Sequence, residues 1–159
     1  MIMERNALAA NPYQPVGFDP PDVIDPDKVG AYDVLVKSGG GMFYDEVLEY
    51  RVWCHPHCGA PPAKPNNHSD YYCAFATYAD ALKFACETPG AEEPLVLVKQ
   101  REWVHQLSES ESEEANTGAN RYVRRAGERI AEWRVEWLRN GPRKENDIEK
   151  FLAHGMVEG

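Results

Sequence analysis

The sequence lacks an apolar run of about 18 residues, the length that a membrane-spanning helix requires. Its start, Met1-Ile-Met-Glu-Arg-Asn, lacks the basic and apolar regions of a signal peptide. Cysteine is also scarce, with four in 159 residues, so the chain is not a disulfide-rich scaffold. We therefore expect a cytoplasmic protein with reduced thiols and no membrane partner.

Positive charge is in the minority, with 17 Lys and Arg against 26 Asp and Glu and a net charge of −9. This balance argues against general nucleic-acid binding. The basic residues are unevenly placed, because residues 1–120 hold 8 of them with 19 acidic residues, whereas residues 121–144 hold 8 with 3 acidic residues. Segment 121–144 either pairs with acidic groups of its own chain or meets an acidic partner. The candidate partner-binding residues are Arg121, Arg124, Arg125 and Arg129.

The length and the 43% hydrophobic content predict one domain with an apolar core. Residues 1–24 predict an extended arm, because their prolines remove backbone donors. Residues 25–41 predict a helix from about 26 to 38, with Asp25 as its N-cap, followed by a hinge of three glycines, 39–41. The core domain is expected over 42–138, and a linker with a C-terminal helix over 139–159.

Within the core domain, residues 47–54 alternate in hydrophobicity and predict a strand. A second strand is expected at 71–76. Thr77 and Asp80 then form a capping pattern for a helix over 78–88. Residues 94–103, rich in Leu and Val, predict a further strand near the middle of the sheet.

Residues 105–120 predict a polar loop, and 122–125 with 129–138 predict a hairpin that turns at 126–128. A C-terminal helix ending at Gly155 follows a capping pattern of Asn146 and Glu149. The predicted order is α-β-β-α-β-β-β-α. The expected fold class is α+β, with a mainly antiparallel sheet of about five strands and helices packed on one face. The β-α-β unit over 71–103 either forms a parallel pair or brackets another strand.

Six cysteines and histidines crowd residues 54–73, where the predicted hairpin opens. They are Cys54, His55, His57, Cys58, His68 and Cys73. Zinc binds four N or S ligands, usually as two close pairs from different segments. The set that could converge across the hairpin is Cys54, Cys58, His68 and Cys73, with His55 as an alternative to Cys54. The pattern favours unliganded loop residues with one packed cysteine, and so no cofactor, and a zinc site is the alternative.

The sequence contains residues for two other site chemistries. Cys54 or Cys58 beside a histidine has the residue types of a nucleophilic pair, although adjacent residues on a strand rarely face each other. Aromatic residues on the predicted strands, Trp103, Trp133 and Trp137 among them, either form an exposed binding platform or pack in the core. Trp133 and Trp137 share a predicted strand face with Ala131 and Val135, and this pattern favours the core.

Four longer strings carry a family resemblance. They are Tyr44-Asp-Glu-Val-Leu-Glu-Tyr-Arg-Val-Trp-Cys-His-Pro, Asp70-Tyr-Tyr-Cys-Ala-Phe-Ala-Thr-Tyr-Ala-Asp-Ala-Leu, Gly90-Ala-Glu-Glu-Pro-Leu-Val-Leu-Val and Glu128-Arg-Ile-Ala-Glu-Trp. Over about residues 42–153 the chain resembles a family of small uncharacterised bacterial proteins often labelled GNAT-type, that is, acetyltransferase-like. The resemblance implies binding of acetyl-coenzyme A by a loop of the form Arg/Gln-x-x-Gly-x-Gly/Ala that opens a helix.

The nearest match to that loop is Arg124-x-x-Gly127-x-Arg129, which ends in arginine and leads into a predicted strand, so no site residue is carried over. The catalytic and cofactor-binding residues remain unassigned. The sequence favours a non-enzymatic module that binds a protein partner or a second copy of itself. A GNAT-like acetyltransferase and a zinc-binding domain are the alternatives.

Overall fold

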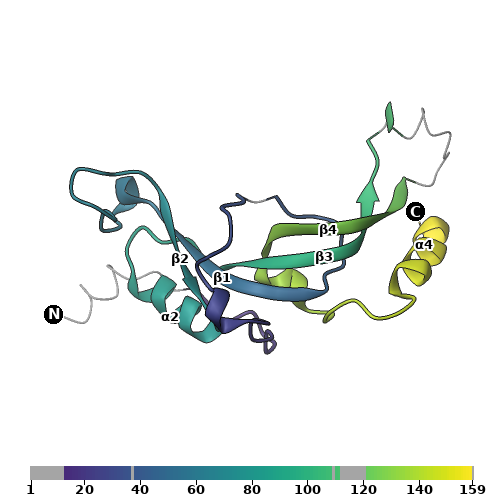
Figure 1. The fold of residues 1–159 in the computed structure, drawn as a ribbon, viewed down its shortest axis with the longest axis horizontal. Helices are drawn as coiled ribbons and strands as arrows, with labels where there is room; N and C mark the ends of the chain where they lie inside the picture. The colour runs from purple at the N-terminus through teal and green to yellow at the C-terminus, as the bar shows by residue number, and fades with distance from the viewer. Residues whose placement is uncertain (1–12, 37, 109, 112–120, 159) are drawn as a thin grey trace.

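Four strands form one antiparallel sheet in the order β2-β1-β3-β4 (Figure 1). The computed structural model describes residues 13–36, 38–108, 110–111 and 121–158. For residues 154–158 it describes the backbone alone. The strands are β1 (Glu46–Cys54), β2 (Tyr71–Phe75), β3 (Leu95–Gln106) and β4 (Tyr122–Arg134). The α-helices are α2 (Tyr78–Glu87) and α4 (Asp147–Glu158), and the short 3₁₀ helices are η1 (Pro26–Lys28), η2 (Pro56–Cys58) and η3 (Val135–Leu138). The α+β class and the antiparallel sheet are confirmed.

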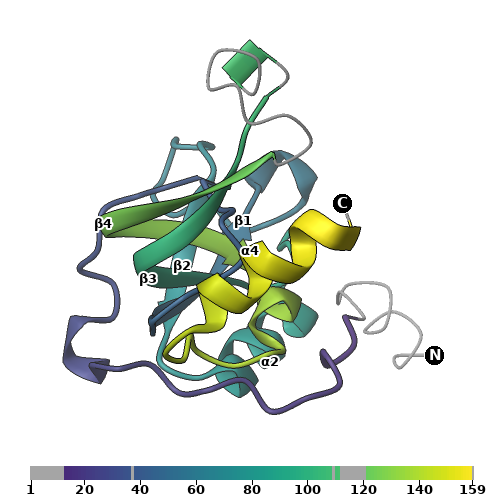
Figure 2. The same ribbon diagram turned by 90° about the vertical axis from the view of Figure 1, so that its right-hand side faces the viewer.

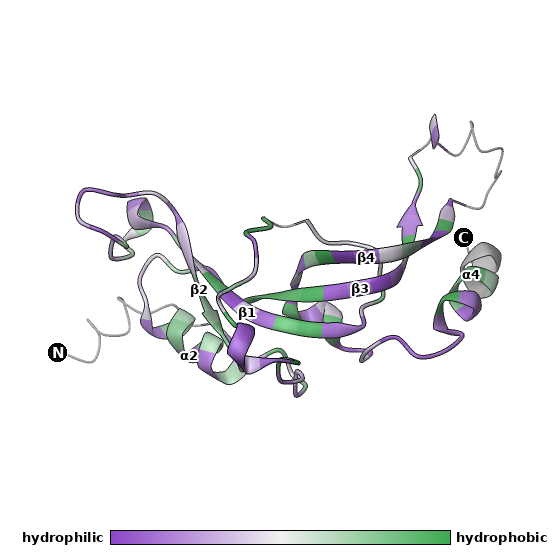
Figure 3. Ribbon diagram, in the orientation of Figure 1, coloured by the Kyte–Doolittle hydropathy of each residue, from purple (hydrophilic) through white to green (hydrophobic). Residues whose placement is uncertain are grey.

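Strand β1 lies between β2 and β3, so the β-α-β segment brackets another strand instead of forming a parallel pair. Helix α2 begins as the sequence predicts, because the Thr77 hydroxyl accepts a hydrogen bond from the Asp80 amide at 3.1 Å. Figures 1 and 2 show α2 at the β1–β2 end of the sheet and α4 beside the far part of β3 and β4. The hydrophobic stretches of the strands lie where β1 and β3 cross the middle of the sheet (Figure 3).

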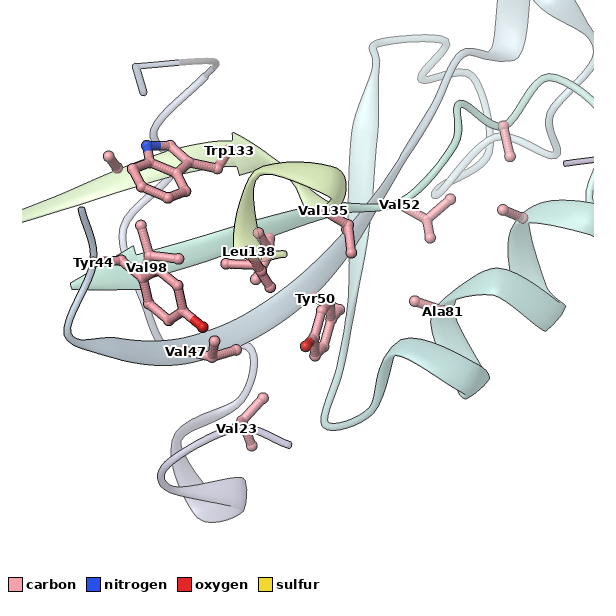
Figure 4. Packing of buried hydrophobic residues seen from close by; sticks show 14 of the residues in the cluster. Val23, Tyr44, Val47, Tyr50, Val52, Ala81, Val98, Trp133, Val135 and Leu138 are labelled. Atoms are coloured by element: carbon pink, nitrogen blue, oxygen red, sulfur yellow. The ribbon is translucent and has the colours of Figure 1, made fainter. Parts of the chain in front are cut away.

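The hydrophobic core covers one face of the sheet (Figure 4). Tyr50 and Val52 of β1 pack there with Ala81 of α2 and with Val135 and Leu138 of η3. Helix α2 and the 3₁₀ helix η3, where a strand was predicted, therefore both contribute to the core on this face. The arm from residue 13 to 24 has no helix or strand, and its Val23 is buried in the same core. Residues 1–12 of the predicted arm lie outside the described residues.

The opposite face carries a buried ionic network centred on Arg51. Its guanidinium donates to Glu49 at 2.6 Å and to Glu132 at 3.1 Å, and all three side chains are fully buried. It also donates to the carbonyls of Asp33 at 2.9 Å and Leu35 at 3.5 Å. The segment that precedes the glycine run therefore covers this face of the sheet through its backbone groups.

The predicted helix over 26–38 is wrong beyond its first turn. Asp25 caps the start and Pro26 follows it, as expected, but η1 ends at Lys28. The Gly30 amide donates to Glu49 at 2.8 Å, and the carbonyls further along accept from Arg51. Backbone groups that would form helical hydrogen bonds are instead bound to the buried network.

The predicted hairpin at 122–138 is also wrong, and with it the fifth strand and the predicted order. Residues 126–128 lie inside the single strand β4, and Gly127, with φ of 135°, lies where the β3–β4 pairing shifts register, between the pairs Gln100–Arg129 and Glu102–Ala126. The chain leaves the sheet at Arg134 and forms η3. Trp133 is buried as expected, but Trp137 is 48% exposed because η3 turns it away from the strand face.

The C-terminal helix is confirmed, although its ends differ from the prediction. Asn146 has φ of 71° and is not an extended N-cap, and the Asp147 carboxylate accepts from the Lys144 amide at 2.8 Å instead. The helix continues past Gly155 to Glu158. Strand β3 extends to Gln106, into the predicted polar loop, of which residue 109 and residues 112–120 lie outside the described residues. No helix in the described part of the chain is long and apolar enough to cross a membrane.

Candidate functional site

A cleft with a volume of about 800 Å³ lies where the glycine run, the sheet and the C-terminal helix meet. Four parts of the chain line it. They are residues 38–43, residues 103–106 of β3, the stretch of β4 and η3 from Arg129 to Gly141, and Asp147 with Phe151 of α4. Segments more than a hundred positions apart in sequence thus share one cleft. We refer to it below as the aromatic cleft, because Phe43, Trp103, Trp133, Trp137 and Phe151 line it.

Arg129 and Trp103 form the polar and aromatic centre of the aromatic cleft. The guanidinium carbon lies 4.0 Å from the centre of the Trp103 ring, a cation–π contact. The Arg129 Nε donates to the Gln100 side-chain oxygen at 2.7 Å, and Nη2 donates to the Gly40 carbonyl at 3.4 Å. Gln100 is itself held in place, because its amide nitrogen donates to the carbonyls of Gly40 and Phe43 at 2.9 and 2.8 Å.

Arg129 is half-buried and pairs with no carboxylate among the described residues. Burial lowers the pKa of its guanidinium from the ordinary value. Its partners among the described residues are all neutral. The aromatic cleft therefore contains a partly desolvated positive charge.

The glycine run packs directly on the cleft walls, so the expected hinge is in close contact with its surroundings. A Cβ atom on Gly39 would lie 2.2 Å from Cδ1 of Trp133 and 2.5 Å from the Glu132 carbonyl. A Cβ atom on Gly41 would lie 2.8 Å from Trp103 and 2.9 Å from the Arg129 guanidinium. Glycine is required here because any side chain would displace these residues.

Two apolar side chains of the aromatic cleft are exposed. Trp137 is 48% exposed and Met42 is 46% exposed. Trp137 meets Trp133 edge to face at 5.8 Å between ring centres. Trp133 is buried, and its indole N–H has no acceptor among the described residues.

Helix α4 closes one side of the cleft through Phe151. Its ring meets those of Phe43 and Tyr122 at 5.9 and 5.3 Å, both edge to face. Arg124 strengthens this junction, since it donates to Glu102 at 2.7 Å and forms a close ion pair with Glu149 of α4. The hydrogen bonds to these carboxylates raise the pKa of the Arg124 guanidinium.

The four candidate partner-binding arginines therefore differ in their surroundings. Arg129 lines the aromatic cleft, whereas Arg124 is engaged with two carboxylates of its own chain. Arg125 is exposed on β4 opposite Trp103 in the strand register. Arg121 precedes β4, and its carbonyl accepts from the Leu107 amide at 2.6 Å. Neither Arg121 nor Arg125 forms an ion pair with a described residue.

The structure brings two of the four candidate zinc ligands together. Cys54 is fully buried in β1, and its thiol interacts with that of Cys73 on β2. Cys58 is exposed in η2, and His68 is exposed in the connecting loop. Within the described part of the chain, no group of three or more His, Cys, Asp or Glu residues could hold a metal ion. Burial raises the pKa of the Cys54 thiol to about 11, which opposes formation of the thiolate that a ligand or nucleophile requires.

His55 takes part in a different arrangement from either of those expected. Its Nδ1 lies 3.0 Å from Asp70, and its Nε2 forms a close contact with Glu92. Hydrogen bonds with Glu92 and then Asp70 raise the pKa of His55 above its ordinary value of 6.5. The ring therefore links the connecting loop to the segment before β3.

The charge of segment 121–144 points to Arg129 but not to the cleft that contains it. The spacing of Trp137 with Trp133 and Val135 predicts a core position, and the departure of the chain from the sheet at η3 has no clear local signal. One signal was available in the run Gly39-Gly40-Gly41, because consecutive glycines permit backbone to approach large side chains closely.

Comparisons of the chain with protein-family models, with curated proteins and with solved structures found no match.

Proposed function

We propose that the protein is a binding module whose aromatic cleft receives an apolar side chain of a protein partner. The observation that carries the proposal is the exposure of Trp137 and Met42 at the edge of a cleft of about 800 Å³. Exposed tryptophan costs free energy in water, and a partner that covers it recovers about 25 cal/mol per Å² of apolar surface. Tryptophan and arginine are also the residues that most often dominate binding energy at protein interfaces.

The form of the aromatic cleft supports a peptide segment as the ligand. Its walls follow β4 and η3 from Arg129 to Trp137 and include the backbone of the glycine run. Backbone groups, aromatic rings and one positive charge are the features by which extended peptide segments are recognised.

Peptide display on the purified protein tests this proposal. Peptides selected on the natural chain should share one or two apolar anchor residues. They should bind the double variant Trp137→Ala, Met42→Ala about tenfold or more weakly, because the apolar contacts are lost. The matched control is Val34→Ala, Val36→Ala, which truncates two apolar residues that are 56% and 61% exposed but do not line the cleft.

The control variant should bind the selected peptides as tightly as the natural chain does. Equal binding by the cleft variant, or selection without a shared motif, would contradict the proposal. Turnover of acetyl-coenzyme A by the purified protein would instead support the acetyltransferase that the family resemblance implies. One equivalent of zinc after purification would support the zinc-binding alternative.

A further inference from the structure

We infer that the partner segment carries an acidic side chain beside its apolar anchor, and that Arg129 binds this carboxylate in the aromatic cleft. The inference rests on the proposed function and specifies the chemistry of the ligand. Arg129 is a half-buried cation, and all of its partners among the described residues are neutral.

Arg129 retains hydrogen-bonding capacity. A guanidinium has five N–H groups, and the described contacts use Nε and one N–H of Nη2. Gln100 and the ring of Trp103 hold the group in place, so a ligand would meet an ordered donor and lose little side-chain entropy on binding.

The carboxylates that line the aromatic cleft already have partners. Glu136 pairs with Arg134 at 2.7 Å, and Asp147 accepts from the Lys144 amide at 2.8 Å. Arg139, the other cation of the lining, is exposed, lies over Phe18 at 4.9 Å and donates to the Val16 carbonyl at 3.1 Å. Of these two cleft arginines, Arg129 is therefore the one that is both half-buried and bound by neutral groups.

A carboxylate would complete the electrostatics of this position. Partial burial removes water from the guanidinium, and its neutral partners replace only part of that interaction. A carboxylate can accept two parallel N–H groups of a guanidinium, and such charge-assisted hydrogen bonds are about twice as strong as neutral ones. The aromatic neighbours favour a ligand in which the carboxylate stands next to apolar groups, which is why we infer an acidic–apolar segment and not a free inorganic anion.

Two blocked tripeptides provide the test, acetyl-Phe-Glu-Phe-amide and acetyl-Phe-Gln-Phe-amide. They differ only in the negative charge. The four indole N–H signals of the protein report binding by nuclear magnetic resonance, because Trp103, Trp133 and Trp137 line the cleft. Trp53 is an internal control, since its N–H donates to Glu132 at 3.0 Å in the network outside the cleft.

The glutamate peptide should shift the signals of the three cleft tryptophans and leave that of Trp53 in place. It should bind about tenfold or more tightly than the glutamine peptide. The reason is that Arg129 would donate to a charged carboxylate in the glutamate peptide and to a neutral amide oxygen in the glutamine peptide. Arg129→Gln should abolish this difference and Arg129→Lys should retain part of it. The matched control Arg125→Gln removes an exposed arginine four residues away on β4 and should preserve the difference.

The outcomes separate the inference from the proposed function. If both peptides shift the cleft signals with equal affinity, the cleft binds apolar segments and the inference about the acidic side chain is wrong. If neither peptide shifts them, both proposals fail for this class of ligand. If inorganic phosphate shifts the same signals as strongly as the glutamate peptide, or if Arg125→Gln abolishes the difference, recognition is a general charge effect and the inference is again wrong. An unchanged Trp53 signal in each variant shows that the fold is preserved.

Discussion

Arg51 and Arg129 each lie over an aromatic ring, at 4.3 Å from Tyr72 and 4.0 Å from Trp103, yet their surroundings are opposite. Arg51 is fully buried and bound by two carboxylates and two backbone carbonyls. Arg129 is half-buried and bound by neutral oxygens alone among the described residues. An arginine whose donors are satisfied within the chain supports the fold, and one with unused donors in a cleft is available to a ligand.

The largest effect should come from removing the satisfied arginine. Arg51→Met leaves Glu49 and Glu132 buried without their cation, and it should reduce the free energy of unfolding by about 3–5 kcal/mol. Urea unfolding followed by circular dichroism measures the change. Arg125→Met, an exposed position on β4, is the control and should stay within about 0.5 kcal/mol of the natural chain. A loss below about 1 kcal/mol for Arg51→Met would show that the network does not hold the sheet together.

A much smaller effect is expected at the other arginine. Arg129→Met removes a partly desolvated charge along with its neutral hydrogen bonds and its contact with Trp103, so gains and losses largely offset each other. The free energy of unfolding should change by no more than about 1 kcal/mol, in either direction. The same urea titration checks this result. If Arg129→Met were as destabilising as Arg51→Met, Arg129 would be a structural residue and the contrast between the two would fail.

The smallest effect concerns His55. It resembles Arg51 in having two carboxylate neighbours and Arg129 in being partly exposed, with a side chain that is 27% exposed. Its pKa in the folded chain lies above the ordinary 6.5, so the folded state binds the proton more tightly than the unfolded state. The resulting stabilisation is complete below about pH 6.5 and is lost as the pH rises through the folded-state pKa. The stability difference between the natural chain and His55→Gln should therefore be larger near about pH 5.5 than near about pH 8.5.

Urea unfolding at the two pH values measures this difference. His68→Gln changes an exposed histidine of the same connecting loop and serves as the matched control. If the stability difference between the natural chain and His55→Gln does not change with pH, the two carboxylates do not stabilise the protonated His55 ring in the folded protein.

The parts of the fold that the sequence predicted are those with local causes. The hydroxyl of Thr77 caps α2 three residues away, and the alternation of β1 places Tyr50 and Val52 on the core face while Arg51 points to the other. Such signals operate within a few residues. They were sufficient for β1, β2, α2 and the antiparallel character of the sheet.

The errors arose where distant residues determine local structure. The chain from Gly30 to Leu35 follows the N-cap Asp25 and lies within the predicted helix, but Glu49 and Arg51 bind its backbone groups. Gly127 is a residue type typical of a turn. Pairing with β3 nevertheless keeps it within β4, where it forms an irregularity in the strand. In both cases tertiary hydrogen bonds outweigh local preference.

The candidate site was predicted only in fragments for the same reason. Arg129 was found from the charge of segment 121–144, but its importance depends on Trp103, Gly40 and Gln100, which are 26 or more positions earlier. The Cys/His cluster drew attention by its density in sequence. The fold separates it into a thiol pair with one buried and one half-buried member, three exposed residues and a histidine bound by carboxylates.

The ionic network also has a consequence for the order in which the protein can fold during synthesis. Arg51 leaves the ribosome with Glu49 and the covering segment already made, but its partner Glu132 follows 81 residues later. At about 5–20 residues per second, several seconds pass in which the central strand carries a cation that lacks one of its two carboxylates. The face around Arg51 should remain hydrated during that interval, since burying an incompletely paired charge is costly. Completion of the sheet therefore waits for β4, and a nascent chain that stops before Glu132 should remain sensitive to protease over the residues that cover this face.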